Sequence, residues 1–130
     1  MGSVDPKLRD LAQADNFAAL TVNLASGRAM TQVMWVDADD DHVLINTEVH
    51  RAKFRAVERD PRVTVMIWDK NDPYSYGEVR GDVVETVRGP EARAHIDALS
   101  RKYRDRDYDP GDIHSERVML RIAPHMQRLR

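Results

Sequence analysis

The sequence contains no cysteine, which excludes disulfides, thiolate nucleophiles and cysteine-ligated zinc or iron–sulfur sites. It also lacks an excess of either charge: 20 basic and 22 acidic residues give a net charge of -2, without the positive field that nucleic-acid binding needs. No apolar run approaches the ~20 residues that span a bilayer, and the N-terminal residues have no signal-peptide core. We therefore expect a cytoplasmic protein that binds neither nucleic acid nor membrane.

Several catalytic motifs are absent as well. The six glycines are isolated, so neither a dinucleotide fingerprint nor a P-loop exists, and no serine lies in a Gly-x-Ser-x-Gly elbow. The five histidines show no metal-ligand spacing, and the acidic run 39–41 lacks the alternating ligands of a calcium loop. We expect no metal site, and the sequence identifies no catalytic residue.

The length of 130 residues predicts one domain, 1–130, with a single core. Apolar alternation predicts strands over 17–25, 29–37, 43–45, 63–68, 74–87 and 116–124, and helical spacing predicts helices over 6–14, 51–59 and 91–104. Gly77 and Gly81 indicate bends or close approaches, and 104–115 is predicted to be a loop. About six antiparallel strands with short connections and flanking helices favour a small β-barrel over a doubly wound sheet.

A cationic turn lies between the strands that end at Asn46-Thr47 and begin at Val63. Arg51, Lys53 and Arg55 crowd the first turn of the predicted helix, where the peptide dipole is already positive. Cations there do not stabilise the helix, but together with free amide donors they suit a phosphate or carboxylate. A solvent-exposed basic helix face is the alternative, and the spacing alone leaves both interpretations open.

Aromatic residues accompany this turn, although no acid–base or nucleophilic machinery does. They are Trp35, Trp68, Tyr74 and Tyr76. Such a combination is typical of a protein that holds and orients an organic cofactor, which itself carries the chemistry.

These residues form a pattern that resembles a known family. The pattern is Asn46-Thr47-x-x-x-Arg51-x-Lys53-x-Arg55, then Asp60-Pro61-Arg62-Val63 and Tyr76-x-Glu78-Val79-Arg80-Gly81. It resembles the split-barrel flavin/deazaflavin oxidoreductases, the pyridoxamine-phosphate-oxidase-like proteins, and in particular the group that binds the deazaflavin coenzyme F-420. The resemblance extends over about 17–124. It implies a mainly β split barrel that forms a homodimer with two cofactor sites between the subunits.

The resemblance also implies which residues bind the cofactor. Arg51 and Lys53 match the residues that hold its phosphate, and Arg55 would assist there or bind an anionic tail. Tyr76 matches a position that closes the groove. The positions that match those lining the ring and ribityl chain are Thr31, Gln32, Val33, Asn46 and Thr47.

The activity implied is hydride transfer between the reduced deazaflavin and a small electron-poor substrate, with a proton from solvent or a nearby donor. Two alternatives remain at this point. One is an FMN-dependent oxidase or reductase of the same fold, and the other is a non-catalytic F-420-binding or storage protein. Composition does not separate them.

Overall fold

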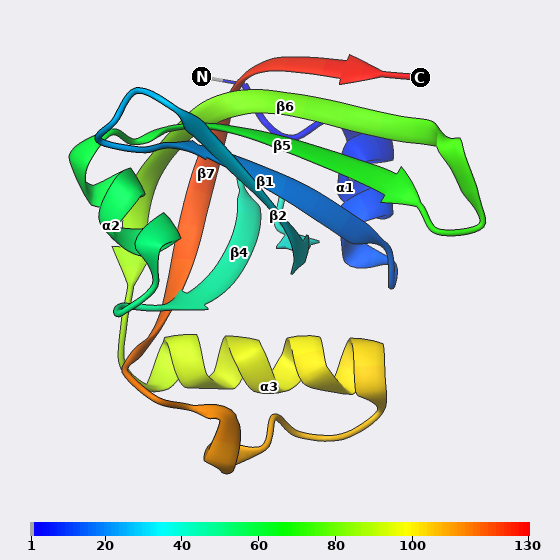
Figure 1. Cartoon of the computed structure of the whole chain (residues 1–130). Helices are drawn as coiled ribbons and strands as arrows, with labels where there is room; N and C mark the ends of the chain where they lie inside the picture. The colour runs from blue at the N-terminus through cyan, green and yellow to red at the C-terminus, as the bar shows by residue number, and fades with distance from the viewer. Residues whose placement is uncertain (1) are drawn as a thin grey trace.

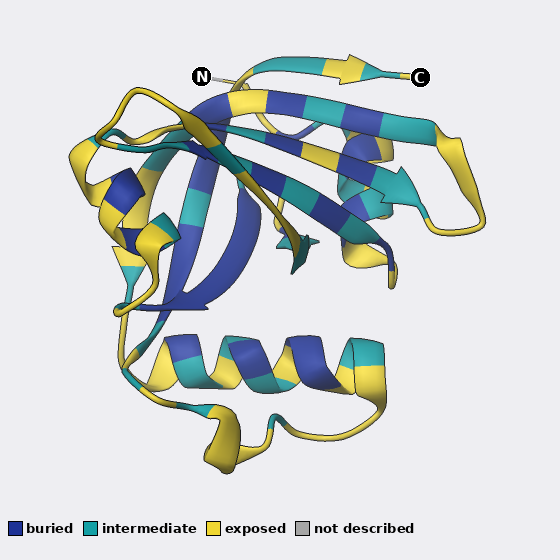
Figure 2. Ribbon diagram, viewed as in Figure 1, coloured by how far each residue is buried: buried dark blue, intermediate teal, exposed yellow. Residues whose placement is uncertain are grey.

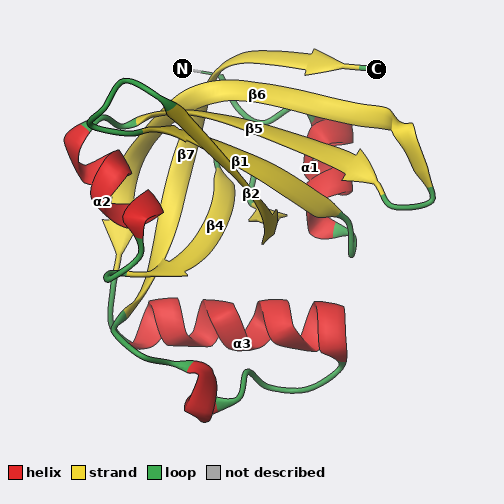
Figure 3. Cartoon of the chain, in the orientation of Figure 1, coloured by secondary structure: helices red, strands yellow, loops and turns green. Residues whose placement is uncertain are grey.

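The computed structural model describes residues 2–130 and shows one curled antiparallel sheet flanked by helices (Figures 1 and 3). Its strands are β1 (Phe17–Asn23), β2 (Ala29–Trp35), β3 (Asp37–Ala38), β4 (Val43–Glu48), β5 (Arg62–Asp69), β6 (Asp72–Val87) and β7 (Arg117–Leu129). Its helices are α1 (Pro6–Gln13), α2 (Ala52–Arg59) and α3 (Pro90–Arg104), with a 3-10 turn η1 (Pro110–Asp112). The expected β-barrel class with flanking helices is confirmed.

The strand order is β2-β1-β5-β6-β7-β4-β3, and every pair of neighbours is antiparallel. The sheet curls so that the edge strand β2 comes close to β4, although the two are not paired in the described sheet. Helix α3 lies across the end of the barrel beside β4 and β7 (Figure 1). Lys53 of α2 and Leu99 of α3 line pockets between β2 and β4, so both helices border this part of the barrel.

Two glycines allow the long strand β6 to bend and pack. A Cβ on Gly81 would lie 2.1 Å from the backbone oxygen of Ala123, and the β6–β7 register shifts between Arg80 and Gly81. A Cβ on Gly77 would lie 2.1 Å from Leu8 Cδ1. The predicted bend and close backbone approach are confirmed at Gly81, whereas the close neighbour at Gly77 is a side chain.

The helices bury the apolar faces that the sequence predicted. Helix α1 begins at Asp5, whose side chain accepts a hydrogen bond from the Lys7 N–H at 2.9 Å, and it buries Leu8. Helix α2 buries Phe54 and Val57. No helix in residues 2–130 combines the length and the apolar character needed to cross a bilayer.

The structure corrects three details of the prediction. Strand β4 does not stop at Asn46-Thr47 but continues to Glu48, and all six of its residues are buried (Figure 2). Strand β7 runs on to Leu129, beyond the predicted end at 124, because this part pairs with β6. The short strand β3 makes the count within residues 2–130 seven rather than about six.

Candidate functional site

Two adjoining pockets lie between β2 and β4. They share four lining residues, Val33, Met34, Asn46 and Arg117. The first, which we call the cationic pocket, has a volume of about 280 Å³ and adds Gln32, Thr47, Arg51 and Lys53. The second, the aromatic pocket, has a volume of about 240 Å³ and adds Trp35, Ile96, Leu99, Arg104 and Tyr108. The shared residues make the two pockets parts of one groove.

The cationic pocket contains positive charge without a counter-ion. Arg51 is the N-cap residue of α2 and makes no side-chain cap bond, and Lys53 lies in the first turn. Burial, followed by the charges of Arg51 and Arg117, lowers the pKa of Lys53. Within residues 2–130, neither Arg51 nor Lys53 has a carboxylate within 4.0 Å. A bound anion would relieve this mutual repulsion.

Arg117 forms the wall common to both pockets, and sequence reasoning missed it. Its side chain is only 10% exposed, and Nη1 lies 3.3 Å from Glu48 Oε2. Burial, the largest influence, lowers the Arg117 pKa. Burial of Glu48 acts to raise its pKa, but N–H groups of Ser115 and His114, each 2.7 Å from Oε1, outweigh it together with Arg117 and lower the pKa. The cation is therefore fixed in place.

Asn46 connects Arg117 to α3. Its Oδ1 accepts a hydrogen bond from Arg117 Nε at 2.9 Å, and its Nδ2 donates to Ala92 O and His95 Nδ1, each at 3.0 Å. These three bonds determine the orientation of the amide. They also place the proton of neutral His95 on Nε2, which is buried without a hydrogen-bond partner in the described structure. Burial, partly offset by Asp37 at 4.0 Å, lowers the His95 pKa to about 4.

A rigid stack forms the wall of the aromatic pocket. The rings of Trp35 and Tyr103 are stacked with centroids 5.1 Å apart, and Tyr108 meets Trp35 edge-on at 6.2 Å. The Tyr103 hydroxyl donates to Asn16 O and accepts from the Val36 N–H at 3.2 Å. Burial is the main cause that raises the Tyr103 pKa to about 12. The hydroxyl thus stays protonated and keeps the stack in place.

The segment 104–115 is tied to α3 through Tyr108. The Tyr108 N–H donates to Asp97 Oδ1 at 3.0 Å, and the Tyr108 carbonyl accepts from Arg93 Nη2 at 3.2 Å. Its ring lies 5.1 Å from the Arg117 guanidinium. The predicted loop therefore supplies part of the pocket wall.

The structure brings together six of the predicted cofactor-binding residues and leaves three apart. The six that line the cationic pocket are Gln32, Val33, Asn46, Thr47, Arg51 and Lys53. Arg55 instead donates to His50 O at 2.9 Å and faces a different depression, with Arg59. Thr31 and Tyr76 lie together on the outer face of the sheet. Besides Arg117, the residues that the sequence analysis did not place in the groove include Arg104 and Tyr108.

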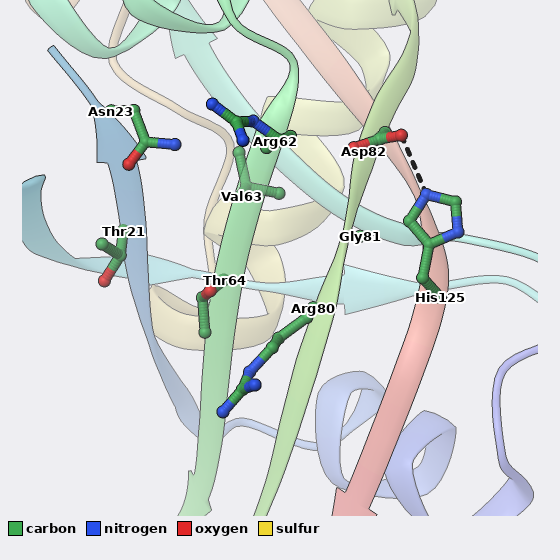
Figure 4. Close-up of a pocket in the computed structure, with 9 residues that line it drawn as sticks. All are labelled: Thr21, Asn23, Arg62, Val63, Thr64, Arg80, Gly81, Asp82 and His125. Carbon is green, nitrogen blue, oxygen red and sulfur yellow. Dashed lines mark hydrogen bonds and ion pairs between the residues drawn. The ribbon is translucent and has the colours of Figure 1, made fainter. Parts of the chain in front are cut away.

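A larger pocket of about 430 Å³ lies on the outer face of the sheet, across β1, β5, β6 and β7 (Figure 4). A neighbouring depression of about 400 Å³ shares Thr21 and Thr64 with it and includes Met66, and we call the two together the outer trough. Its charged groups are already paired: Arg62 with Asp60 at 2.8 Å, Arg80 with Glu78 at 3.2 Å, and His125 with Asp82 at 2.8 Å. The outer trough is therefore a poorer anion site than the cationic pocket, despite its size.

Residues 2–130 contain no group of three or more His, Asp or Glu side chains arranged to hold a metal ion. The polar groups of the groove are mainly arginine, lysine and amide side chains, which bind anions and hydrogen-bond acceptors. Its chemistry thus suits an anionic organic molecule.

Comparison with known proteins agrees with this fold. The sequence model of the pyridoxamine 5'-phosphate oxidase family matches residues 4–129. The chain belongs to this family, whose fold is that of flavin- and deazaflavin-type oxidoreductases. No curated protein matches the sequence at a significant level.

Solved structures share the fold at low sequence identity. An F-420 reductase superposes with a TM-score of 0.82 at 23% identity, covering 96% of this chain and 98% of the other. A conserved hypothetical protein from Mycobacterium tuberculosis gives 0.72 at 21% identity, covering 95% and 82%. General Stress Protein 26 from Bacillus anthracis gives 0.65 at 18% identity, covering 93% and 88%. At these identities the similarity establishes the fold.

Proposed function

We propose that this protein is an F-420-dependent oxidoreductase that transfers a hydride between the reduced deazaflavin and a small electron-poor substrate. The observation that carries the proposal is the uncompensated pair Arg51 and Lys53, in a pocket continuous with an aromatic one. The similarity to an F-420 reductase over nearly the whole chain supports the deazaflavin as the cofactor.

The donor set of the cationic pocket fits a phosphorylated cofactor. Arg51 and Lys53 stand beside the N-terminus of α2, where free N–H groups add to the positive field. Thr47 and Gln32 supply neutral hydrogen-bonding groups. On the other wall, Val33 is 66% exposed on the edge strand β2, whose outer backbone groups are unpaired in the described sheet. A flat heterocycle needs such an apolar surface beside backbone donors and acceptors.

When bound, a reduced deazaflavin supplies the hydride. The chain's own residues bind and orient: Arg51 and Lys53 hold the phosphate, and Asn46 and Arg117 form a fixed polar wall. His95 is neutral near pH 7 and engaged with Asn46, so it is not free to act as an acid. We propose that the proton comes from solvent, through the open side of the groove.

Cofactor titration tests this proposal. Replacing both Arg51 and Lys53 with alanine should weaken F-420 binding by about 2–4 kcal/mol, roughly 30- to 1,000-fold in Kd, because two charge-assisted contacts to phosphate are lost. The measurement is fluorescence titration of the purified protein with F-420. Unchanged affinity would reject the phosphate site.

Two single substitutions on the same helix serve as comparisons for the double variant. Arg59→Ala removes a cation that donates to Asn23 O and lines neither pocket of the groove, so F-420 affinity should not change. Arg55→Ala tests the role that the sequence predicted for Arg55. Weakening by Arg55→Ala alone, without an effect of Arg59→Ala, would extend the anion site to Arg55.

The same purified protein also tests the two alternative hypotheses, an FMN-dependent enzyme and a non-catalytic F-420-binding protein. FMN also carries a phosphate, so the cationic pocket alone does not choose between the cofactors. Parallel titration with FMN and the absorption spectrum of the purified protein decide between them. Tight F-420 binding without hydride transfer to any of a panel of quinones and enones would favour a storage protein.

We also propose that the chain forms a homodimer with cofactor sites at the subunit interface. The outer trough supports this, because it is a continuous uncovered surface that includes Met66, which is 39% exposed. Thr31 and Tyr76 lie on it. Contact through this face would give both residues a place near a shared site, in line with their predicted roles.

A further inference from the structure

The aromatic pocket differs in chemistry from the cationic pocket beside it. Ile96 and Leu99 of α3 and Met34 of β2 contribute apolar surface, while Trp35 and Tyr108 contribute rings nearly perpendicular to each other. Planar conjugated molecules bind well to such walls, because they pack against the face or edge of an aromatic ring and neither surface gives up a hydrogen bond. The pocket therefore selects for a flat, unsaturated body.

This pocket is formed before any ligand arrives. Trp35 is held by its stack on Tyr103, and Tyr103 itself stacks on Phe17 at 5.6 Å. The backbone of Tyr108 is held on both sides by α3. Because these side chains are already ordered, a ligand loses little binding energy to ordering them.

The charge available to a ligand here is that of Arg104. Arg117 is nearby, but its charge is balanced by Glu48 at 3.3 Å. Arg104 is exposed, its guanidinium lies 4.9 Å from the centre of the Trp35 ring, and it has no carboxylate within 4.0 Å among residues 2–130. One unpaired cation thus stands at the margin of an apolar, aromatic cavity.

We propose that the aromatic pocket is the substrate subsite and that it takes a planar conjugated carboxylate, with the flat body against Tyr108, Leu99 and the edge of the Trp35 ring, and the carboxylate on Arg104. That this ligand is the substrate rests on the proposed function. The binding of a planar carboxylate at this place does not, since it needs only the residues of the aromatic pocket.

The test uses three small probes on the full chain without added cofactor. Trans-cinnamate is flat and charged, trans-cinnamamide is its neutral counterpart, and cyclohexanepropionate keeps the charge but is saturated. Isothermal titration calorimetry should show cinnamate binding about tenfold more tightly than either of the others, as expected for one charge-assisted contact and one aromatic contact. Equal affinity for cinnamate and cinnamamide would overturn the proposal.

Matched variants locate the contact. Arg104→Gln should reduce the preference for cinnamate over cinnamamide to less than about twofold, because the charged donor is lost while the aromatic wall remains. Arg106→Gln removes an exposed cation two positions away that lines neither pocket, and the preference should persist. The same loss in both variants would show a diffuse charge effect and reject the assigned role of Arg104.

The indole N–H signals of the two tryptophans report ligand binding without a substitution in the pocket. Cinnamate should shift the indole N–H signal of Trp35 and leave that of Trp68 in β5 unmoved, with Trp68→Phe used for assignment. A shift of Trp68 alone would place the ligand elsewhere. If F-420 binds and cinnamate does not, only the substrate subsite fails; if cinnamate binds and F-420 does not, the proposed function fails instead.

Discussion

Asn46 lines the groove and is also buried in the barrel. It is buried, and its amide bonds to β7 through Arg117 and to α3 through Ala92 and His95. A buried polar group costs free energy unless its hydrogen bonds are satisfied, so these partners are what allow polar residues to form the groove wall. The order of this wall thus depends in part on Ala92 and His95, which line neither pocket.

His95 makes the stability of the fold depend on pH. Burial lowers its pKa from 6.5 to about 4 in the folded chain. Between these values the unfolded chain binds more protons, so stability falls as the pH falls through this window. From about pH 7 to about pH 5, His95 should lower the free energy of unfolding by about 2 kcal/mol.

Urea unfolding of the wild type and of His95→Gln at both pH values measures this contribution. Glutamine does not titrate, so the variant should lose about 2 kcal/mol less on acidification than the wild type. An identical pH dependence in the two proteins would show that His95 does not titrate in this range.

The candidate site could be predicted only as far as its residues lie near each other in sequence. Asn46, Thr47, Arg51 and Lys53 belong to one short motif, and the structure gathers them. Arg117 begins an alternating strand, a position that usually faces solvent, and its partner Asn46 is 71 residues away. No local pattern contains such a contact.

At the level of elements, hydrophobic alternation predicted the middle of the strands better than their ends. β4 was expected to end where polar residues begin, but Asn46, Thr47 and Glu48 are all buried in the strand. The polar end of β7 has no apolar alternation, yet it pairs with β6 as far as Leu129. Pairing with a neighbouring strand determined these ends, and that information is not local.

Strand β6 offers a comparison between two glycines. In Gly81→Ala the new Cβ would meet the Ala123 backbone oxygen at 2.1 Å, and β7 would have to move. In Gly77→Ala it would meet the end of the Leu8 side chain, which can change rotamer at lower cost. We expect Gly81→Ala to destabilise the fold by at least about 2 kcal/mol and Gly77→Ala by about 1 kcal/mol.

Chemical denaturation of both variants checks this order. Both changes give β6 an alanine in place of glycine, so they differ mainly in what the new methyl group meets. Equal stability losses would mean that β7 yields as easily as the Leu8 side chain.

The sequence predicted the barrel class, but it predicted neither how far the sheet curls nor which of its faces stays uncovered. Short connections and alternating strands favoured an antiparallel barrel, which the structure shows. How far the sheet curls, and which of its faces stays uncovered, depend on how distant strands pack. The outer trough therefore had no counterpart in the sequence analysis.

Self-association tests the proposed homodimer. Sedimentation equilibrium should give twice the mass of the 14.9 kDa chain. Met66→Glu should shift the protein toward the monomer, because a charge would be buried in the contact. Val84→Glu is the control, since Val84 is 52% exposed but lies outside the outer trough. A monomeric wild type, or dissociation by both variants, would contradict dimerisation through this face.

Gln127 of β7 joins the two ends of the chain: its Oε1 accepts from the Asp5 N–H at 2.7 Å, and its Nε2 donates to Ser3 O at 2.9 Å. Both ends emerge on the side of the barrel away from α3 (Figure 1). An affinity tag or a biosensor tether on either end would therefore lie away from the end of the barrel that α3 covers, and ligand binding can be followed on immobilised protein.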